Sequence, residues 1–310
     1  MTHVATFICA PHAPRLTGHL LRQAGAALPR AAQCIWLDNG VAADIAFAPA
    51  IADNLRELTA AVRDRLDGAA VDVVLQPARA RRKRLLAADM DSTMIMQECI
   101  DELAAAVGRK AAVAAVTARA MRGELAFETS LRERVALVAG LHRDEIAGFF
   151  EKAVTVTPGA RTLVRTMRRA GARTALLSGG FAIIAKQVAD AIGFEESFAN
   201  ELAFDDAGRL TGVVEPLLGD AAKRDRLRAL RDASGLAAEE TLAVGDGAND
   251  LLMLHEAGLG VAFRGKPAVV AAAPARIDHG DLTALLYIQG YPRGAFAEDE
   301  GECGRPGWMP

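Results

Sequence analysis

Four short apolar runs, each bordered by helical segments, constrain the fold of this chain most strongly. The runs are Leu85–Ala88, Arg173–Leu177, Thr241–Val244 and Leu259–Phe263, and the helical segments include Ala160–Ala170 and Phe181–Ile192. Runs that are apolar at successive positions are typical of strands buried on both faces of a parallel sheet. The sequence therefore predicts an α/β fold with a doubly wound parallel sheet, in which ligands bind beyond the carboxyl ends of the strands.

Two acids one residue apart, Asp89 and Asp91, follow the first run within the stretch Asp-Met-Asp-Ser-Thr. Ionised carboxylates this close repel each other unless a cation or a strong hydrogen-bond donor lies between them. An isolated Asp-x-Asp is most often a solvated turn or a helix cap. The pair indicates a functional site only if the rest of the chain supplies the missing positive charge.

Three further motifs follow in order along the predicted sheet. Ser178-Gly179-Gly180 comes after the second run, Lys223 opens the helix Arg224–Ala233, and Gly245-Asp246-Gly247-Ala248-Asn249-Asp250 comes after the third run. Each motif alone is commonly a turn, a solvated lysine or a loop. With all four motifs in this order, the chain resembles the haloacid dehalogenase (HAD) superfamily from residue 85 to about residue 288.

This resemblance implies Mg²⁺-dependent phosphoryl transfer. A carboxylate can attack phosphorus only if the charge on the phosphoryl oxygens is neutralised, which a divalent cation does well. By resemblance, Asp89 would be the nucleophile that forms an aspartyl-phosphate, and Asp91 would act as general acid and then as general base. Asp89, the main-chain carbonyl of Asp91 and Asp246 would hold the metal. The phosphate would be bound by Ser178, Gly179, Lys223 and Asn249, with Asp250 orienting Lys223 or the metal's water ligands.

A purely helical stretch from Glu98 to about Val154 separates the first two predicted strands, with breaks near Gly108, Gly123 and Gly140. An insertion at this point of an α/β sheet lies above the strand ends. We therefore expect residues 98–154 to form an all-helical cap that closes over the site as a lid.

Within the superfamily, two parts of the chain resemble the phosphoserine phosphatase branch. Glu98 lies nine residues after Asp89, where that branch uses a carboxylate to hold the substrate ammonium, and the segment 121–135 also matches. The resemblance implies that Arg134 clamps the substrate carboxylate, since a guanidinium fits a carboxylate bidentately, and that Phe127 walls the pocket. Without the resemblance, Glu98 would be a surface acid at a helix start and Arg134 an exposed helix residue.

The first 78 residues show a different pattern. They predict strands and helices in the order βαββαβ, with a hairpin turn at Asp38-Asn39-Gly40,. The module resembles a degenerate ACT domain, a small regulatory fold. Its first loop, residues 10–14, lacks the glycine typical of that family, so effector binding is left open. Five of the six residues 79–84 are basic, which we interpret as a solvated linker in preference to a nucleic-acid patch.

The predicted organisation has five parts. They are an ACT-like domain at 1–78, a basic linker at 79–84, a HAD-like core at 85–97 and 155–288, a cap at 98–154 and a tail at 289–310. The tail is rich in Gly, Pro and acids, so we expect it to be weakly ordered or bound to the surface.

Composition limits the partners of this chain. It is 51% hydrophobic and 24% charged with a net charge of −3, which is typical of a globular protein and argues against broad nucleic-acid binding. There is no pattern of a signal peptide or a membrane span. The four cysteines are far apart, which favours free thiols and a cytoplasmic location. A homodimer is left open.

The sequence thus predicts an enzyme that hydrolyses O-phosphoserine, a small phosphomonoester. One alternative is a HAD phosphatase or phosphotransferase acting on another ester, such as phosphohomoserine or phosphoethanolamine. A second is a non-enzymatic amino-acid sensor that uses the N-terminal module.

Overall fold

The computed structural model describes residues 1–121 and 124–298 of the chain. The chain divides into two compact units, each assembled from more than one stretch of the sequence. The first unit contains Met1–Arg82, Pro158–Ala172 and the residues from His279 onward, and the second contains Lys83–Thr157 and Arg173–Asp278. Within the described ranges, no helix is both long and apolar enough to span a bilayer.

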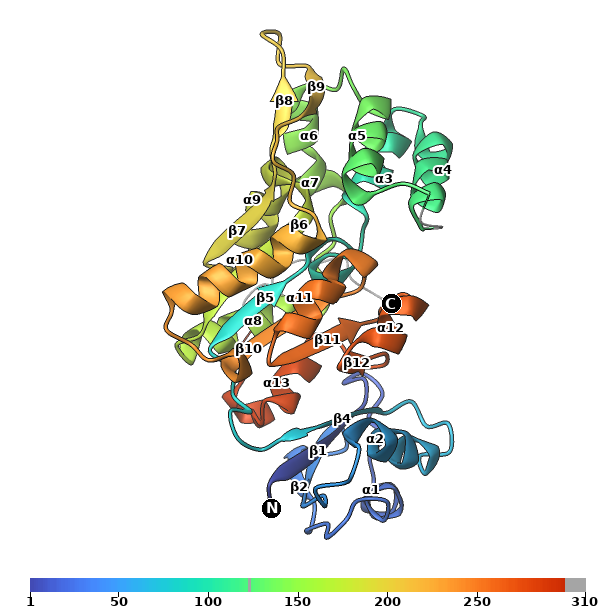
Figure 1. Cartoon of the computed structure of the whole chain (residues 1–310), viewed down its shortest axis with the longest axis vertical. Helices are drawn as coiled ribbons and strands as arrows, with labels where there is room; N and C mark the ends of the chain where they lie inside the picture. Colours follow the sequence, from blue (N-terminus) through green and yellow to red (C-terminus); the bar gives the residue numbers. More distant parts are fainter. Residues whose placement is uncertain (122–123, 299–310) are drawn as a thin grey trace. The chain divides into compact units, whose positions relative to one another are not determined.

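A four-stranded antiparallel sheet with two helices forms the N-terminal part of the first unit (Figure 1). Its elements are β1 (His3–Ile8), α1 (Gly18–Gly25), β2 (Ile35–Asp38), β3 (Ala42–Phe47), α2 (Leu55–Asp64) and β4 (Asp72–Pro77). The strand order is β2-β3-β1-β4, and all neighbours are antiparallel. The predicted element order is therefore present. The sequence pattern predicts helices over Arg15–Leu28 and Ala50–Leu66; both begin later, because the side chains of Thr17 and Asn54 cap their first turns,.

The two faces of this sheet differ in chemistry. Phe7, Ile45 and Val73 belong to an apolar core together with residues of α1 and α2. Thr6 precedes Phe7 and Asp44 precedes Ile45. Both side chains lie on the opposite face of the sheet, because successive side chains of a strand alternate between its faces. Thr6 donates its hydroxyl to Asp44 at 2.8 Å.

Arg81 binds the polar face of the sheet to the C-terminal part of the same unit. Its guanidinium contacts both carboxylate oxygens of Asp44, at 2.6 and 2.7 Å. Its Nε donates at 2.7 Å to the carbonyl of Ile288, the last residue of α13 (Ala284–Ile288). Only 16% of the Arg81 side chain is exposed. The prediction of a solvated basic run is therefore wrong at this residue, whose charge is paired with a buried carboxylate.

The C-terminal segment of the first unit is packed as far as the structure describes it. Tyr291 and Phe296 are both buried, and α8 (Ala160–Arg169) reaches the segment through a hydrogen bond from Arg169 to the carbonyl of Ala295. Of the predicted tail, residues 299–310 lie outside the described residues. The part before them is held by packing and by hydrogen bonds.

The second unit is built on a six-stranded parallel sheet, in the order β12-β11-β10-β5-β6-β7. The strands are β5 (Leu85–Ala88), β6 (Arg173–Phe181), β7 (Glu196–Asn200), β10 (Thr241–Gly245), β11 (Leu259–Phe263) and β12 (Ala275–Ile277). Every residue of β5, β10 and β11 is buried. The parallel sheet and its four predicted strands are confirmed; β7 and β12 at its edges were not predicted.

Helices cover this sheet and connect its strands. The helices α10 (Asp220–Ala233), α11 (Leu251–Glu256) and α12 (Pro267–Ala272) lie beside the strands of this sheet (Figure 1). Residues of the three helices share one apolar core with Leu85, Ala175 and Ala243 of the strands. The helix α9 (Ala182–Ile192) follows β6 directly, and a hairpin of β8 (Leu202–Phe204) and β9 (Leu210–Val213) follows β7. The carboxyl ends of β5, β6 and β10 meet at one edge of the sheet, as parallel strands require.

The stretch between β5 and β6 is helical, as predicted. It contains α3 (Cys99–Ala106), α4 (Lys110–Met121), α5 (Phe127–Leu137), α6 (Arg143–Ala147) and α7 (Phe149–Ala153). Gly108 and Gly140 follow α3 and α5 with φ of 68° and 89°, a conformation that glycine adopts without strain. The third predicted break, Gly123, lies outside the described residues. We call the helices α3 to α7 the helical insertion.

Candidate active site

A tight turn carries the first acidic motif away from β5. Asp89 begins it and is fixed by its backbone N–H, which donates to the carbonyl of Val244 in the neighbouring strand at 2.9 Å. A single irregular helical turn follows over Met90–Met94, and within it Ser92 has a φ of 55°. The turn is closed by a hydrogen bond from the N–H of Ile95 to the carbonyl of Met90. Asp89 thereby lies at the end of β5, beside the end of β10.

Three buried acids gather around this point. Carboxylate oxygens of Asp89, Asp246 and Asp250 lie within 4.8 Å of one another. Lys223, whose side chain is 0% exposed, donates to Asp89 at 2.5 Å and to Asp250 at 2.8 Å. Asp250 also accepts a hydrogen bond from the N–H of Gly247 at 3.0 Å. Lys223 therefore links two of the three acids, and Asp250 orients it.

Burial and the neighbouring charges shift the pKa values of Asp89, Asp246 and Lys223. Burial, followed by the charge of Asp250, raises the pKa of Asp89 well above its usual range. Burial also raises the pKa of Asp246 to about 6. Burial alone would lower the pKa of Lys223, but the two carboxylates outweigh it and raise that pKa. Lys223 is bound to two of the three crowded acids and not to Asp246, and the hard oxygen ligands of the cluster suit a divalent cation such as Mg²⁺,.

Asp91 is half-buried next to this cluster, but its carboxylate is not one of the three grouped acids. Its Oδ1 has no hydrogen-bond partner within the part of the chain that the structure describes. Burial, with the charge of Glu98 second, raises the pKa of Asp91 to about 7, and a hydrogen bond with Cys99 acts against the rise. A carboxyl group with such a pKa is suited to giving and taking a proton near neutral pH.

The second strand end supplies small and neutral groups. Ser178, Gly179 and Gly180 belong to the last residues of β6, where its pairing with β7 shifts register. The prediction that the strand stops at Leu177 is therefore wrong by four residues, because the chain rejoins β7 at Phe181. Ser178 Oγ accepts the N–H of Gly180 at 2.9 Å. The amide of Asn200 in β7 donates to the carbonyl of Gly179 at the same distance.

The helical insertion supplies the opposite wall. Arg134 on α5 is half-buried, and its Nε donates to the carbonyl of Ser130 at 3.3 Å. Burial lowers its pKa, while the charges of Glu98 and Asp101 act in the other direction. Glu98 precedes α3 and accepts a hydrogen bond from Ser92 Oγ at 2.9 Å. Arg134 is therefore not the exposed helix residue that the alternative interpretation requires.

These groups line one pocket of about 810 Å³ in the second unit. Eight of the ten predicted site residues line it, and the other two, Lys223 and Asp250, are fully buried. The eight are Asp89, Asp91, Glu98, Arg134, Ser178, Gly179, Asp246 and Asn249. The structure thus brings the predicted residues together, while their roles stay predictions.

The pocket also contains charged residues that no motif indicated. Lys266 lies 3.2 Å from Asp246 and 3.5 Å from Glu98, and Asp101 and Asp220 line the wall. Lys266 precedes a short helix in a segment without a recognisable pattern. No sequence signal we used could have indicated it.

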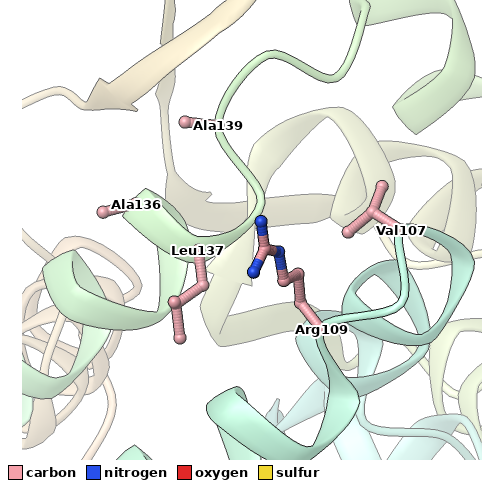
Figure 2. A pocket seen from close by; sticks show the side chains of 5 residues that line it. All are labelled: Val107, Arg109, Ala136, Leu137 and Ala139. Carbon is pink, nitrogen blue, oxygen red and sulfur yellow. The ribbon is translucent and has the colours of Figure 1, made fainter.

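A second hollow, of about 410 Å³, lies in the helical insertion (Figure 2). Four of its five lining residues are apolar, and the guanidinium of Arg109 extends among them. Besides this arginine, none of the lining residues is charged. The hollow therefore has little with which to select a ligand.

Comparison with known proteins agrees with this geometry. A phosphoserine phosphatase from Mycobacterium tuberculosis is 45% identical over 226 residues, which are 72% of this chain and 55% of that protein. A probable phosphoserine phosphatase from Schizosaccharomyces pombe is 44% identical over 211 residues, 67% of this chain and 70% of its own length. The chain thus matches little more than half the length of the Mycobacterium tuberculosis protein.

Two solved structures share the fold over nearly the whole chain. A HAD-family hydrolase from Salmonella enterica serovar Typhi superposes with a TM-score of 0.82 at 26% identity, covering 93% of this chain and 99% of that one. A probable phosphoserine phosphatase from Vibrio cholerae gives 0.73 at 29% identity, covering 95% and 88%. The model of the haloacid dehalogenase-like hydrolases matches residues 86–255, more than half of the chain. This chain therefore belongs to the haloacid dehalogenase-like hydrolase family.

Proposed function

We propose that this chain is a Mg²⁺-dependent phosphoserine phosphatase, which hydrolyses O-phosphoserine to serine and inorganic phosphate. The observation that carries the proposal is a single pocket lined by Asp89, Glu98 and Arg134. O-phosphoserine has a phosphate, an ammonium and a carboxylate. In this proposal the phosphate meets Asp89 beside the buried Lys223, the ammonium meets Glu98, and the carboxylate meets Arg134. The names of the relatives from two organisms support the same substrate.

The proposed reaction has two steps. Asp89 attacks phosphorus, and the bond from phosphorus to the serine oxygen breaks while Asp91 gives its proton to that oxygen. Asp91 then takes a proton from water, which attacks the aspartyl-phosphate and releases inorganic phosphate and the Asp89 carboxylate. A pKa of about 7 suits Asp91 to both steps. Lys223 fixes Asp89 and offsets the charge that spreads over the phosphoryl oxygens,.

The acids at the strand ends fit the metal that the family resemblance implies. Asp89, Asp246 and the main-chain carbonyl of Asp91 would hold Mg²⁺, with Asp250 acting through Lys223. The metal would supply charge neutralisation on the phosphate. The fit rests on the crowding of buried acids and on the unpartnered Oδ1 of Asp91.

The helical insertion acts as the cap in this proposal. Phe127 at the start of α5 lies against two glycines: a Cβ placed on Gly179 or on Gly219 would come within 3.0 or 3.1 Å of its ring. At Gly179 the ring approaches the backbone that would bind the phosphate. Closure of such a lid excludes water from the reacting groups.

The N-terminal module completes the proposal as an ACT-like domain. Its βαββαβ order and antiparallel sheet support this assignment, and effector binding stays open. The described cysteines Cys9, Cys34 and Cys99 are free thiols, which is consistent with the proposed cytoplasmic location. The homodimer stays a prediction, which light scattering would test.

Turnover of a panel of phosphomonoesters, with Mg²⁺ and with excess chelator, tests the proposed function. We expect O-phosphoserine to be hydrolysed with the highest kcat/KM, and only with the metal. Phosphoethanolamine lacks the carboxylate and should lose the contribution of Arg134. A higher kcat/KM on phosphoethanolamine or phosphohomoserine, or transfer of phosphate to homoserine, would replace the substrate assignment. Serine binding to the full chain without turnover of any ester would favour the sensor.

A further inference from the structure

Glu98 is held by two side chains that the proposed reaction does not use. Its Oε1 accepts the hydroxyl of Ser92 at 2.9 Å and lies 3.5 Å from the ammonium of Lys266. Both partners therefore act on one carboxylate oxygen. A carboxylate has two oxygens, so fixing Oε1 sets the direction in which Oε2 points. All three residues belong to the second unit, and Glu98 and Lys266 line the pocket.

The backbone of Ser92 is strained in making this contact. Its φ of 55° and ψ of 5° place a non-glycine residue in the left-handed region, which is sterically unfavourable for L-residues,. Glycine would avoid that steric conflict but has no hydroxyl. Strained residues of this kind are concentrated at functional sites, where the surrounding structure holds them. The strain at Ser92 accompanies a hydrogen bond to Glu98.

Lys266 contacts two acids of the pocket. Its ammonium lies between Asp246, at 3.2 Å, and Glu98, at 3.5 Å, and its side chain is 43% exposed. Its backbone N–H donates to the carbonyl of Asp246 at 3.0 Å, which fixes the start of the side chain. The residue is therefore a basic partner for Glu98.

We propose that Ser92 and Lys266 are positioning residues that hold Glu98 toward the substrate ammonium, and thereby determine the preference of the pocket for esters with an amino group. This inference rests on the proposed function, in which Glu98 binds that ammonium. Neither residue touches the phosphate or the nucleophile in this scheme; Lys266 also contacts Asp246, a proposed metal ligand, so its variants are compared at saturating Mg²⁺. Their loss therefore affects recognition of the amino group more than phosphoryl transfer.

Two ligands that differ only in the amino group isolate this effect. O-phosphoserine carries an ammonium where 3-phosphoglycerate carries a hydroxyl. We would measure kcat/KM on O-phosphoserine and the inhibition constant of 3-phosphoglycerate against p-nitrophenyl phosphate, at saturating Mg²⁺. The variants are Ser92→Gly, Ser92→Ala, Lys266→Met and Lys266→Arg. Asp67→Gly is the matched control, because Asp67 is exposed in the first unit and has a similar φ of 50°.

We expect Ser92→Gly and Ser92→Ala to lower selectivity for O-phosphoserine over 3-phosphoglycerate about tenfold, the size of one lost hydrogen bond to a charged group. The loss should lie in KM rather than kcat. Ser92→Gly and Ser92→Ala should lose selectivity alike, whereas Asp67→Gly should leave it unchanged. Lys266→Met should lower selectivity and Lys266→Arg should restore most of it.

Equal losses on both ligands, or no change in selectivity, would overturn the inference. The wild-type measurement separates this outcome from a failure of the proposed function. If the unmodified enzyme does not prefer O-phosphoserine to 3-phosphoglycerate, Glu98 is not an ammonium ligand, and both proposals are wrong. If it does, and the variants keep that preference, only the role of Ser92 and Lys266 is wrong.

Discussion

Replacing Lys223 by methionine tests the charge balance of the acid cluster. Methionine keeps much of the volume of the lysine stem but removes both hydrogen bonds, to Asp89 and to Asp250. Both acids are buried, so each would lose a charged partner; Asp250 is 0% exposed, while Asp89 lines the pocket. Removing one member of a buried ion pair costs about 3 to 5 kcal/mol. At about 2 to 4 °C per kcal/mol for a unit of this size, we expect the melting temperature to fall by about 6 to 20 °C.

The measurement is thermal unfolding of the full chain by circular dichroism at pH 7.5 in excess chelator. The metal must be absent, because a dication would bind the unpaired acids and stabilise the folded state by mass action. The double variant Lys223→Met with Asp250→Asn should recover part of the loss, since it removes one of the unpaired charges. A fall of less than about 1 °C, or no recovery in the double variant, would refute the argument that Lys223 compensates these acids.

Three further predictions concern the reaction and the metal. Asp89→Asn should abolish turnover with an unchanged circular dichroism spectrum; retained activity would exclude the covalent route. Arg134→Ala should lower kcat/KM on O-phosphoserine far more than on p-nitrophenyl phosphate, and equal losses would remove the substrate assignment. In chelator, Asp246 should make the folded state less stable as the pH rises from about 4 to about 6. Its pKa is raised from 3.8 to about 6, so the folded state keeps a proton that the unfolded chain has lost, a difference of about 3 kcal/mol at most. Urea unfolding of wild type and Asp246→Asn isolates this contribution, and identical pH profiles would contradict it.

The strands and the catalytic motifs could be predicted because their signals are local. A strand such as Leu85–Ala88 is apolar at successive positions since both of its faces are buried,. The acids and glycines then follow at the strand ends, where the parallel order brings them together. The end of a strand was harder to predict. The sequence pattern ended β6 at Leu177, whereas the strand continues to Phe181, because its last residues pair with β7, a strand that no pattern indicated.

The residues that sequence analysis missed act through contacts between distant segments. Lys266 meets Glu98 across 168 positions of the chain, and Asn200 reaches Gly179 from the neighbouring strand. Neither belongs to a periodic or motif pattern, so only the fold shows their partners. Ser92 stands inside a recognised motif, yet its backbone strain and its bond to Glu98 depend on the turn that follows β5.

The polar face of the N-terminal sheet has a consequence for synthesis of the chain. The strands β1 to β4 leave the ribosome about two hundred residues before the segment that covers them. This face of the sheet is therefore exposed to water during most of translation. Asp72 and Gln76 hydrogen-bond with that late segment, and Asp44 binds Arg81, whose Nε donates to the carbonyl of Ile288. An apolar face in the same place would invite aggregation of the nascent chain. The carboxylates and the amide keep the early sheet hydrated until its own C-terminal segment arrives.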